Sequence, residues 1–358
     1  MKILEVDASP AGGESPEAAA REARYAALAE ELLEDEVLLT AQHLDDQAET
    51  VLLRLLRGSG AAGLAGMPAL RRLGHGWLAR PLLDVPRADL RAWAGAEGLR
   101  WLDDPANEDL VFDRAYLRHR VIPVILGRWP AAARTLARAA GHARESAGLL
   151  DVLARLDRRG ASDSDWIATD ALSGLPADRA GNAVRGWLRD QGIPPPPGAR
   201  LAAILADLVG GRSGGQGEVC WGNYAVRRWR DRLYAIRELH RTPPETISWP
   251  DLREACMLPA GLGSLVAEVP AGELSGGMID GPLEVRWRQG GERIRLHAGG
   301  PRRQLKDLLR EEGIRPWMRD RIPLVYRDGR LVAVADLWAD VDRAFGLNVG
   351  WRDRPRID

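Results

Sequence analysis

The hydrophobic pattern of the chain changes most sharply between residues 37 and 60. Residues 37–41 (VLLTA) form an unbroken apolar run, which predicts a strand buried on both faces of a parallel sheet. After this run, apolar residues recur at the spacing of a helix, and they are Ala48, Val51, Leu52, Leu55 and Leu56. We therefore predict a strand followed by a helix that packs on the sheet through this stripe.

Ionisable residues fill the junction between these two elements. His43 and Asp46 come directly after the predicted strand, and ligands of open α/β sheets bind outside the carboxyl ends of the strands. This placement favours a functional site. Asp45 is predicted to cap the helix, because a carboxylate accepts the N–H groups of the first turn. A structural role, as helix cap or solvated helix face, is the favoured local interpretation for Asp45, Glu49, Arg54 and Arg57.

The same patterns place the other elements. Residues 3–6 are a candidate strand, and Ser15 is predicted to cap a helix that begins at Pro16 and runs to about residue 33. Further strands are predicted at residues 77–80, 218–221, 224–230, 232–237 and 283–288. Further helices are predicted at residues 87–97, 130–156, 178–190 and 198–209. The pair Asp328-Gly329 predicts a hairpin that joins residues 323–327 to 331–335.

Length and charge indicate several domains with different partners. At 358 residues the chain is too long for one compact core, so we expect two or three domains. The net charge of −1 hides a segregation, because residues 1–36 hold three basic and ten acidic residues, whereas residues 283–330 hold thirteen basic and seven acidic ones. The basic stretch is a candidate for binding an anionic partner. Both cysteines are isolated and no apolar run has membrane length, so we predict a cytoplasmic protein without membrane contact.

The end of the predicted strand and the helix after it also resemble a known family. Residues 40–60, TAQHLDDQAETVLLRLLRGSG, resemble the signature of the tRNA(Ile)-lysidine synthetase family, within the PP-loop ATP pyrophosphatase superfamily. His43, Asp46, Glu49 and Thr50 match this signature, whereas Gln42 replaces a common histidine. The resemblance is strong over residues 15–123 and 283–338 and thin between them.

The resemblance implies an α/β fold with three domains. We expect a truncated parallel-sheet PP-loop domain at residues 1–127 and a mainly helical middle domain at 128–240. A connecting segment at 241–282 and a small α+β C-terminal domain at 283–358 would follow.

The phosphate loop of the superfamily has no counterpart here. That loop reads Ser-Gly-Gly-x-Asp-Ser and binds phosphates through consecutive backbone N–H groups. The nearest stretch, Gly12 to Ser15, has one glycine pair, lacks an Asp before its Ser and places Glu14 against the anion. We therefore expect the first strand, the phosphate loop and the following strand of the family to be missing, and the chain as written to lack ATP binding and activity. A misplaced start, a fragment and a true loss are all open.

The resemblance further implies the reaction and its substrates. Family members use ATP with Mg²⁺ to activate the wobble cytidine of tRNA(Ile) as an adenylate, and the side-chain amine of L-lysine then displaces AMP. The catalytic residues implied are His43, Asp46, Glu49 and Arg80. The substrate-binding residues implied are Asp45, Thr50, Asp104, Asn107, Arg114, Arg118 and Arg120. Ala106 and Ala115 depart from the Ser and Asn usual in the family.

The C-terminal domain is implied to bind tRNA. Its candidate contacts are Arg302, Arg303, Lys306, Arg315, Trp317, Arg319 and Arg321. Arg302 and Arg303 are predicted to open a helix, and cations at a helix start favour an anionic partner. A homodimer is a further possible assembly.

Two other functions stay open. His43, Asp45 and Asp46, with Glu49, could form the metal site of a phosphohydrolase, although one histidine leaves the ligand set short. Alternatively, the chain could be a non-catalytic remnant that binds tRNA.

Overall fold

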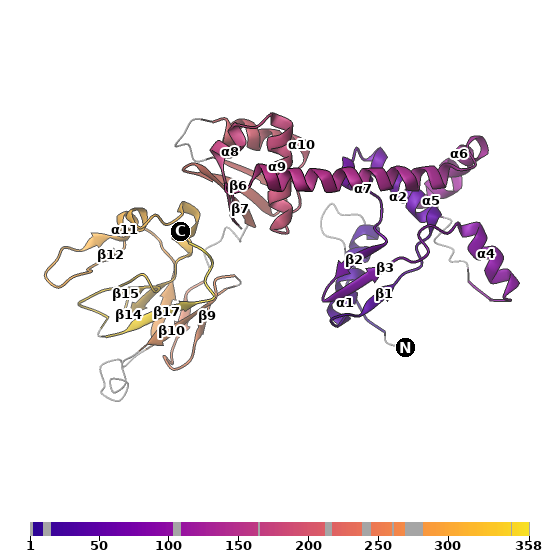
Figure 1. The fold of residues 1–358 in the computed structure, drawn as a ribbon. Coiled ribbons are helices and arrows are strands. Elements are labelled where there is room, and N and C mark those ends of the chain that lie inside the picture. Colours follow the sequence, from indigo (N-terminus) through magenta and orange to yellow (C-terminus); the bar gives the residue numbers. More distant parts are fainter. Residues whose placement is uncertain are drawn as a thin grey trace. The chain divides into compact units, whose positions relative to one another are not determined.

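The computed structural model describes residues 3–9, 16–102, 109–163, 165–211, 217–237, 245–259, 261–268, 282–344 and 346–357. They form two compact units, of which the first comprises Met1–Gly160 and Leu175–Arg189 and the second Ala161–Gly174 and Asp190–Asp358 (Figure 1). Asp104 and Asn107, two of the predicted substrate-binding residues, lie outside the described residues.

The first unit contains one small sheet and most of the helices. Its strands are β1 (Val37–Leu39), β2 (Leu70–Leu73) and β3 (Gly76–Ala79). Its helices are α1 (Pro16–Glu31), α2 (Leu44–Leu56), α3 (Ala61–Leu64), α4 (Arg87–Ala96), α5 (Asp113–Tyr116), α6 (Ile122–Arg128), α7 (Ala132–Asp157) and α9 (Ala177–Asp190), with a π-helical turn η2 (Leu117–Val121) between α5 and α6.

The sheet of the first unit has the order β1-β3-β2, with β1 parallel and β2 antiparallel to β3. The prediction that β1 is buried on both faces is wrong, because Val37 is 48% and Leu39 65% exposed. A strand is buried on both faces only where other elements cover both faces of its sheet, and β1 lies at the edge of a sheet of three strands in the described part of the chain. The candidate strand at residues 3–6 is also wrong, since these residues form no regular element.

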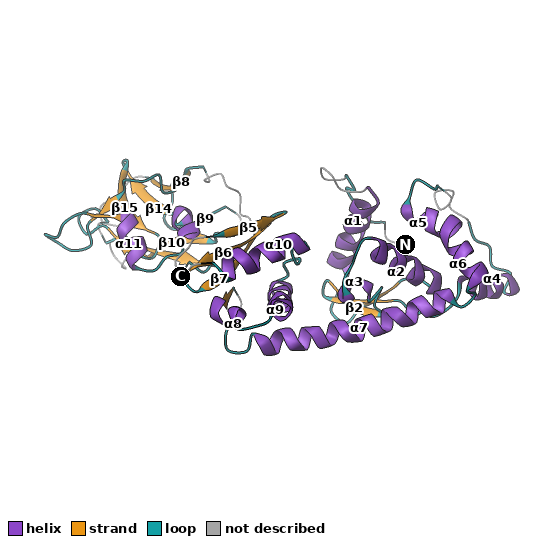
Figure 2. Cartoon of the chain, turned by 90° about the horizontal axis from the view of Figure 1, so that it is seen from above, coloured by secondary structure: helices purple, strands orange, loops and turns teal. Residues whose placement is uncertain are grey.

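Helix α2 packs on α7 and α3, and its buried residues lie between Leu44 and Val51 (Figure 2). The predicted stripe holds at Ala48 and Val51, but Leu55 and Leu56 are exposed. The polar residues Gln47, Glu49 and Thr50 are buried instead. The start of α2, with its ionisable side chains, therefore lies in the interior of the first unit.

Helices α7 and α9 approach each other through small residues. A Cβ atom added at Gly186 would lie 2.7 Å from the Cβ atom of Ala154, and Asn182 donates a hydrogen bond of 2.7 Å to the Leu150 carbonyl. The apolar face expected for α7 is partly wrong, because Leu149 and Leu156 are exposed. A larger side chain at Gly186 would push the helices apart.

The second unit is rich in strands. Its first part holds β4 (Trp166–Ala168), β5 (Glu218–Trp221), β6 (Tyr224–Trp229) and β7 (Arg232–Arg237), with α8 (Thr169–Ser173), α10 (Gly198–Ala203) and the π-helical η3 (Ile204–Val209). Its second part holds β8 (Ile247–Trp249), β9 (Cys256–Met257), β10 (Ser264–Glu268), β11 (Leu283–Arg286), β12 (Arg293–Ile294), β13 (Arg303–Gln304), α11 (Leu305–Glu311), the 3-10 helix η5 (Pro316–Arg321), β14 (Leu324–Arg327), β15 (Arg330–Val334), β16 (Trp338–Ala339) and β17 (Asn348–Arg352).

The strands of the first part form an antiparallel sheet of order β4-β7-β6-β5. This confirms the three strands predicted between residues 218 and 237. The turn between β6 and β7 contains Arg230 at φ 55, a conformation that is uncommon for a residue with a side chain.

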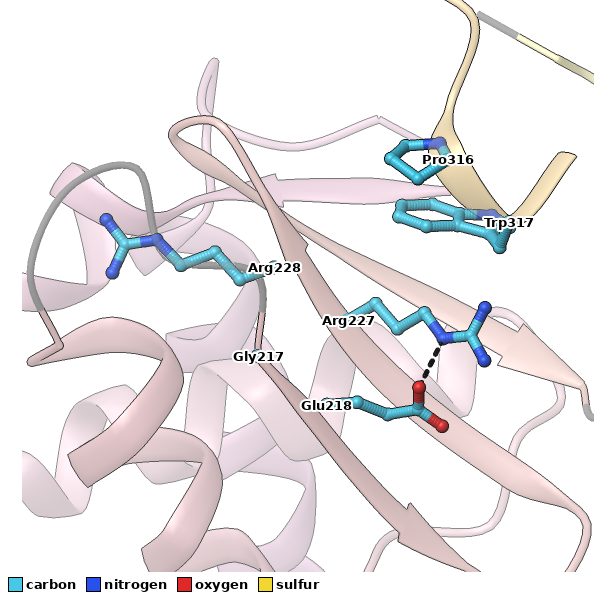
Figure 3. A pocket seen from close by; sticks show the side chains of 6 residues that line it. All are labelled: Gly217, Glu218, Arg227, Arg228, Pro316 and Trp317. Atoms are coloured by element: carbon cyan, nitrogen blue, oxygen red, sulfur yellow. Dashed lines mark hydrogen bonds and ion pairs between the residues drawn. The ribbon is translucent and has the colours of Figure 1, made fainter. Parts of the chain in front are cut away.

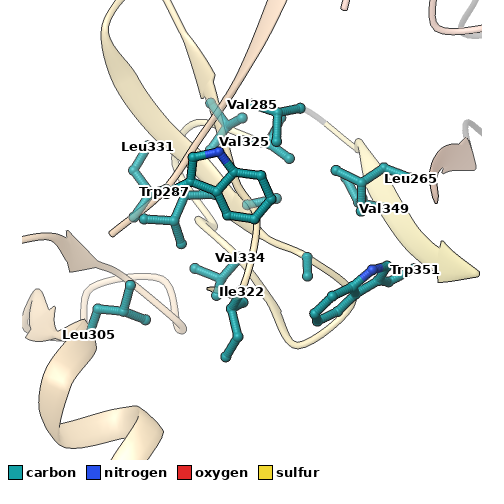
Figure 4. Packing of buried hydrophobic residues seen from close by; sticks show 14 of the residues in the cluster. Leu265, Val285, Trp287, Leu305, Ile322, Val325, Leu331, Val334, Val349 and Trp351 are labelled. Carbon is teal, nitrogen blue, oxygen red and sulfur yellow. The ribbon is translucent and has the colours of Figure 1, made fainter. Parts of the chain in front are cut away.

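The second part is built around one apolar core between two sheets. A five-stranded sheet has the order β16-β15-β14-β11-β8 and a three-stranded sheet the order β17-β10-β9. Trp287, Val325 and Val334 lie in this core, with Leu265 and Trp351 beside them (Figure 4). The predicted hairpin is confirmed, because β14 and β15 pair around Asp328 and Gly329, which both have positive φ.

Residues 241–282 do more than connect two domains. In their described part, β8 pairs with β11 and β10 pairs with β17. Trp249, Cys256 and Leu265 belong to the same apolar core. Across the described residues, no helix combines the length and the apolar character needed to span a bilayer.

Candidate active site

The first turn of α2 is closed by His43 and Asp46. The Asp46 N–H donates to Nδ1 of His43 over 3.4 Å, and the His43 N–H donates to Oδ2 of Asp46 over 3.1 Å. This is a reciprocal capping box. Nε2 of His43 lies 3.5 Å from Oδ2 of Asp46, so the two predicted catalytic side chains are in contact.

Asp45 does not cap its own helix, so that prediction is wrong. Its Oδ2 accepts a hydrogen bond of 2.8 Å from the Arg87 N–H, at the start of α4. His43 is the N-cap residue of α2, and its side chain accepts the hydrogen bond of the Asp46 N–H. The Asp45 carboxylate instead accepts a backbone N–H group at the start of α4. Asp45 thereby ties the beginnings of α2 and α4 together.

Glu49 is the centre of the site. Its side chain is 1% exposed, so the prediction of a solvated position is wrong. Arg118 donates to it twice, from Nε to Oε1 over 2.6 Å and from Nη2 to Oε2 over 3.0 Å, and Nε of Arg114 lies 3.2 Å from Oε2. Arg118 also donates to Oδ1 of Asp46 over 3.1 Å, and Arg114 donates to the Thr50 hydroxyl over 3.0 Å.

The electrostatics of the cluster follow from this pairing. Burial acts to lower the pKa of Arg118, but the hydrogen bond and charge of Glu49, with the charges of Asp46 and Asp45, outweigh it and raise the pKa. Arg118 lies in the π-helical turn η2, a wide turn that is frequent at functional sites. The two arginines therefore balance the buried Glu49 and the partly exposed Asp46, and their side chains face protein carboxylates.

Arg80 lies at the carboxyl end of β3, as predicted, and is buried. Its Nε donates to the Gln42 side chain over 3.1 Å and its Nη1 to the Pro68 carbonyl over 2.8 Å. Thr40 also donates to Gln42. Burial acts to raise the pKa of nearby Tyr25, but Arg21, Arg80 and Gln42 together lower it. Arg80 thus joins the ends of β1 and β3.

The glycine-rich segment after α2, residues 58–66, is held by side chains for which the sequence predicted no such role. Gln47 pairs with the Met67 backbone through both ends of its amide, at 2.9 and 2.7 Å. Arg54 donates to the carbonyls of Gly63 and Gly66, and Arg144 on α7 donates to those of Ala65 and Met67. Arg54 is therefore not a solvated residue. Arg144 gives no local signal, because its partners lie almost 80 residues earlier in the chain.

Arg120 and Arg57 are exposed in the first unit. Arg57 forms an exposed ion pair with Asp113 at 3.2 Å, as expected for a solvated helix face. Arg120 lies away from the contacts of Glu49, and its predicted role in substrate binding stays a prediction.

The cationic helix start predicted near Arg302 is wrong. Helix α11 begins at Leu305, whereas Arg303 belongs to β13 and pairs with Glu311 at 2.6 Å. Arg302 pairs with the fully buried Asp340 at 3.3 Å. Lys306 is exposed in the first turn of α11.

The other predicted tRNA contacts lie around η5. Arg315 is buried, pairs with Asp165 at 2.8 Å and stacks over Tyr234. Arg319 donates to the Ile314 carbonyl over 2.9 Å, and its pKa is lowered by burial and by neighbouring cations. Trp317 packs edge-on against Tyr234, and the pKa of Arg321 is lowered by burial and by Arg227.

The chain matches three family domains and close relatives. Residues 1–125 match the PP-loop domain, residues 168–234 the TilS substrate binding domain and residues 283–351 the TilS substrate C-terminal domain. The chain is 43% identical to the tRNA(Ile)-lysidine synthase of Alkalilimnicola ehrlichii, over 94% of this chain and 76% of that protein. It is 42% identical to the tRNA(Ile)-lysidine synthase of Pseudomonas fluorescens, over 94% of this chain and 75% of that protein. The chain belongs to the tRNA(Ile)-lysidine synthase family.

This family assignment confirms the predicted family, its ligase class and the α/β PP-loop domain followed by a C-terminal domain. A crystal structure of a TILS C-terminal domain, 22% identical, covers 30% of this chain and 98% of that one with a TM-score of 0.24.

The phosphohydrolase alternative finds no support in a family of lysidine synthases or in the donor geometry. Asp45 is directed to α4, whereas Asp46 and Glu49 are directed to Arg118. Among the described residues, no three His, Cys, Asp or Glu side chains gather as a metal site would require.

Proposed function

We propose that the chain carries the site that ligates L-lysine to C2 of the wobble cytidine in a tRNA(Ile) with a CAU anticodon, through an adenylated tRNA. The observation that carries this proposal is the contact of Asp46 with both His43 and Arg118, which joins the family signature to a helical turn some 70 residues later. ATP and Mg²⁺ enter together as a substrate complex, in keeping with the PP-loop match.

Glu49 and Asp46 differ in burial, and this difference supports different roles for their carboxylates. Glu49 is enclosed and already bound by two arginines, so it acts as a positioning residue. Asp46 is 16% exposed in its side chain and keeps Oδ2 toward His43, so Asp46 is the carboxylate that receives the lysine ammonium. An amine attacks only after it loses a proton, and His43, beside Asp46, is the group that accepts this proton.

The arginines have positioning and binding roles. Arg114 and Arg118 hold Thr50, Glu49 and Asp46 in place, and Arg80 orients Gln42 at the neighbouring strand ends. Arg120 is exposed and open to the tRNA. The partners are tRNA(Ile), L-lysine and ATP in the cytoplasm, and a homodimer stays a prediction.

The test separates the chemistry of His43 from its capping role. His43→Asn keeps a favourable N-cap and removes the imidazole, whereas His43→Ala loses both and costs about 1 kcal/mol of stability. Transfer of labelled lysine to tRNA(Ile) is measured in a version extended at its N-terminus by the phosphate-loop segment of the superfamily. We expect both variants, and Asp46→Ala, to lose lysine transfer, with His43→Asn as stable as the unsubstituted protein. Full lysine transfer by His43→Asn would remove His43 from the mechanism.

A further inference from the structure

The second unit contains a cavity between the β6 strand and η5. It has a volume of about 260 Å³ and is lined by Glu218, Arg227, Pro316 and Trp317, among others (Figure 3). A second cavity of about 320 Å³ shares Arg227 and Trp317 with it. We call the two together the junction pocket.

Cations dominate the lining of the junction pocket. Among the described residues, the larger cavity is lined by five arginines, Arg227, Arg237, Arg315, Arg321 and Arg356, and by one acid, Asp165. Two further carboxylates pair with these arginines, Asp163 with Arg356 and Glu218 with Arg227. Among the described residues, the lining of the larger cavity therefore holds more cations than acids, which favours an anionic ligand.

Arg227 is held in position before any ligand arrives. Its Nε donates to Glu218 over 2.7 Å, and its guanidinium lies 5.7 Å from the centre of the Trp317 ring. Trp317 is fixed in turn by edge-on contacts with Tyr234 and Trp229, at 5.3 and 6.4 Å between ring centres. A guanidinium whose geometry is already set loses less conformational entropy when it binds an oxyanion.

The arrangement of Trp317 distinguishes a phosphate from a nucleobase. Figure 3 shows its ring between Pro316 on one side and Arg227 on the other. A base that stacked on this ring would have to compete with Pro316 on one side or with Arg227 on the other. The available chemistry is the binding of an oxyanion by arginine side chains.

We propose that the junction pocket binds one backbone phosphate of the tRNA. Arg227 lies in the range matched by the substrate binding domain, and Trp317 and Arg321 lie in the range matched by the C-terminal domain, so one phosphate would be held by both. This inference rests on the proposed function, because it takes tRNA as the substrate. A free phosphate or mononucleotide offers the same chemistry, and the experiment distinguishes these sources.

The test uses Arg237, which is exposed at the end of β7 and lines the pocket. Binding of a tRNA(Ile) transcript to the full 358-residue chain is measured by fluorescence anisotropy at several salt concentrations. Arg237→Ala should weaken binding and make the slope of log K against log salt shallower by about 0.9, whereas Arg237→Lys should restore the slope. Arg253→Ala, which removes an exposed arginine between β8 and β9, is the matched control and should leave the slope unchanged. Arg321→Gln provides a second variant within the pocket.

The outcomes separate this inference from the function on which it rests. If the unsubstituted chain binds tRNA and Arg237→Ala and Arg321→Gln both match Arg253→Ala, the inference is wrong and the proposed function stands. If the unsubstituted chain does not bind tRNA, the inference and the role of tRNA fall together. Calorimetric titration of the 358-residue chain with AMP and with inorganic phosphate tests whether the pocket binds a free ligand instead. Binding of either one that is lost in Arg237→Ala would assign the pocket to a free ligand and overturn the RNA assignment.

Discussion

Substitution of Arg118 by Ala tests how Glu49, the buried acid of α2, is balanced. The change leaves Glu49, which is 1% exposed, with Arg114 as its remaining cationic partner. At about 3 Å and an effective dielectric constant near 20, the attraction between Arg118 and Glu49 is roughly 5 kcal/mol. Breaking a buried ion pair by removing one partner costs about 3–5 kcal/mol. Because Arg114 stays, we expect a loss at the lower end, about 3 kcal/mol in the free energy of unfolding of the first unit.

The loss should depend on the charge of Glu49. In Arg118→Ala combined with Glu49→Gln, no buried carboxylate is left uncompensated, so the double variant should be more stable than the sum of the single losses predicts, by about 2 kcal/mol. Arg120→Ala is the matched control, because Arg120 is exposed two residues away, and it should change stability by less than about 0.5 kcal/mol.

The assay is urea denaturation followed by circular dichroism, with hydrogen exchange of the α2 amides as a local measure. The local measure is needed because two units can unfold in separate steps. If Arg118→Ala matched Arg120→Ala in both measurements, or if the double variant lost the sum of the single losses, the ion pair would not stabilise the site and the reasoning would be refuted.

Three further predictions concern other parts of the chain. A thiol reagent at neutral pH should label Cys220 quickly and Cys256 only after unfolding, because Cys256 is buried in the C-terminal core and burial raises the pKa of its thiol. Equal labelling rates for the two cysteines would contradict the burial of Cys256. Lys306→Ala should make the slope of log K against log salt for tRNA binding shallower by about 0.9 without loss of stability, whereas Arg302→Ala should lower the denaturation midpoint because it removes the cation paired with the buried Asp340. A stability loss in Lys306→Ala with none in Arg302→Ala would contradict these positions. Calorimetric titration of the 358-residue chain with ATP and Mg²⁺ should show no tight binding, because its sequence contains no Ser-Gly-Gly-x-Asp-Ser loop, and tight binding would show that the loop is dispensable.

Local elements were predictable from the sequence because their causes are local. Periodicity and start signals placed α1, α2 and α9 within a few residues. The pair Asp328-Gly329 placed its hairpin because both residues tolerate positive φ. Within the candidate site, the contact of His43 with Asp46 was also local, since the two residues are three positions apart at a helix start.

The start of α11 was not predictable from charge alone. Arg302 and Arg303 looked like the first turn of a helix, but Arg303 pairs in β13 with β12 and Arg302 balances Asp340. Strand β12 and Asp340 are both distant in sequence from the predicted helix start, so the pattern of neighbouring residues did not indicate these contacts. Strand pairing and a buried acid overrode the local pattern.

The sequence by itself determined the family, the order of most elements and the residues at the carboxyl end of β1. Only the tertiary structure decided which of those residues are available to a substrate. It directed Asp45 to the start of α4 and buried Glu49 against Arg114 and Arg118, leaving Asp46 beside His43. The physical reason is that a buried charge needs a partner wherever the fold brings one, and these partners come from helices 40 to 70 residues away, beyond the reach of any local pattern.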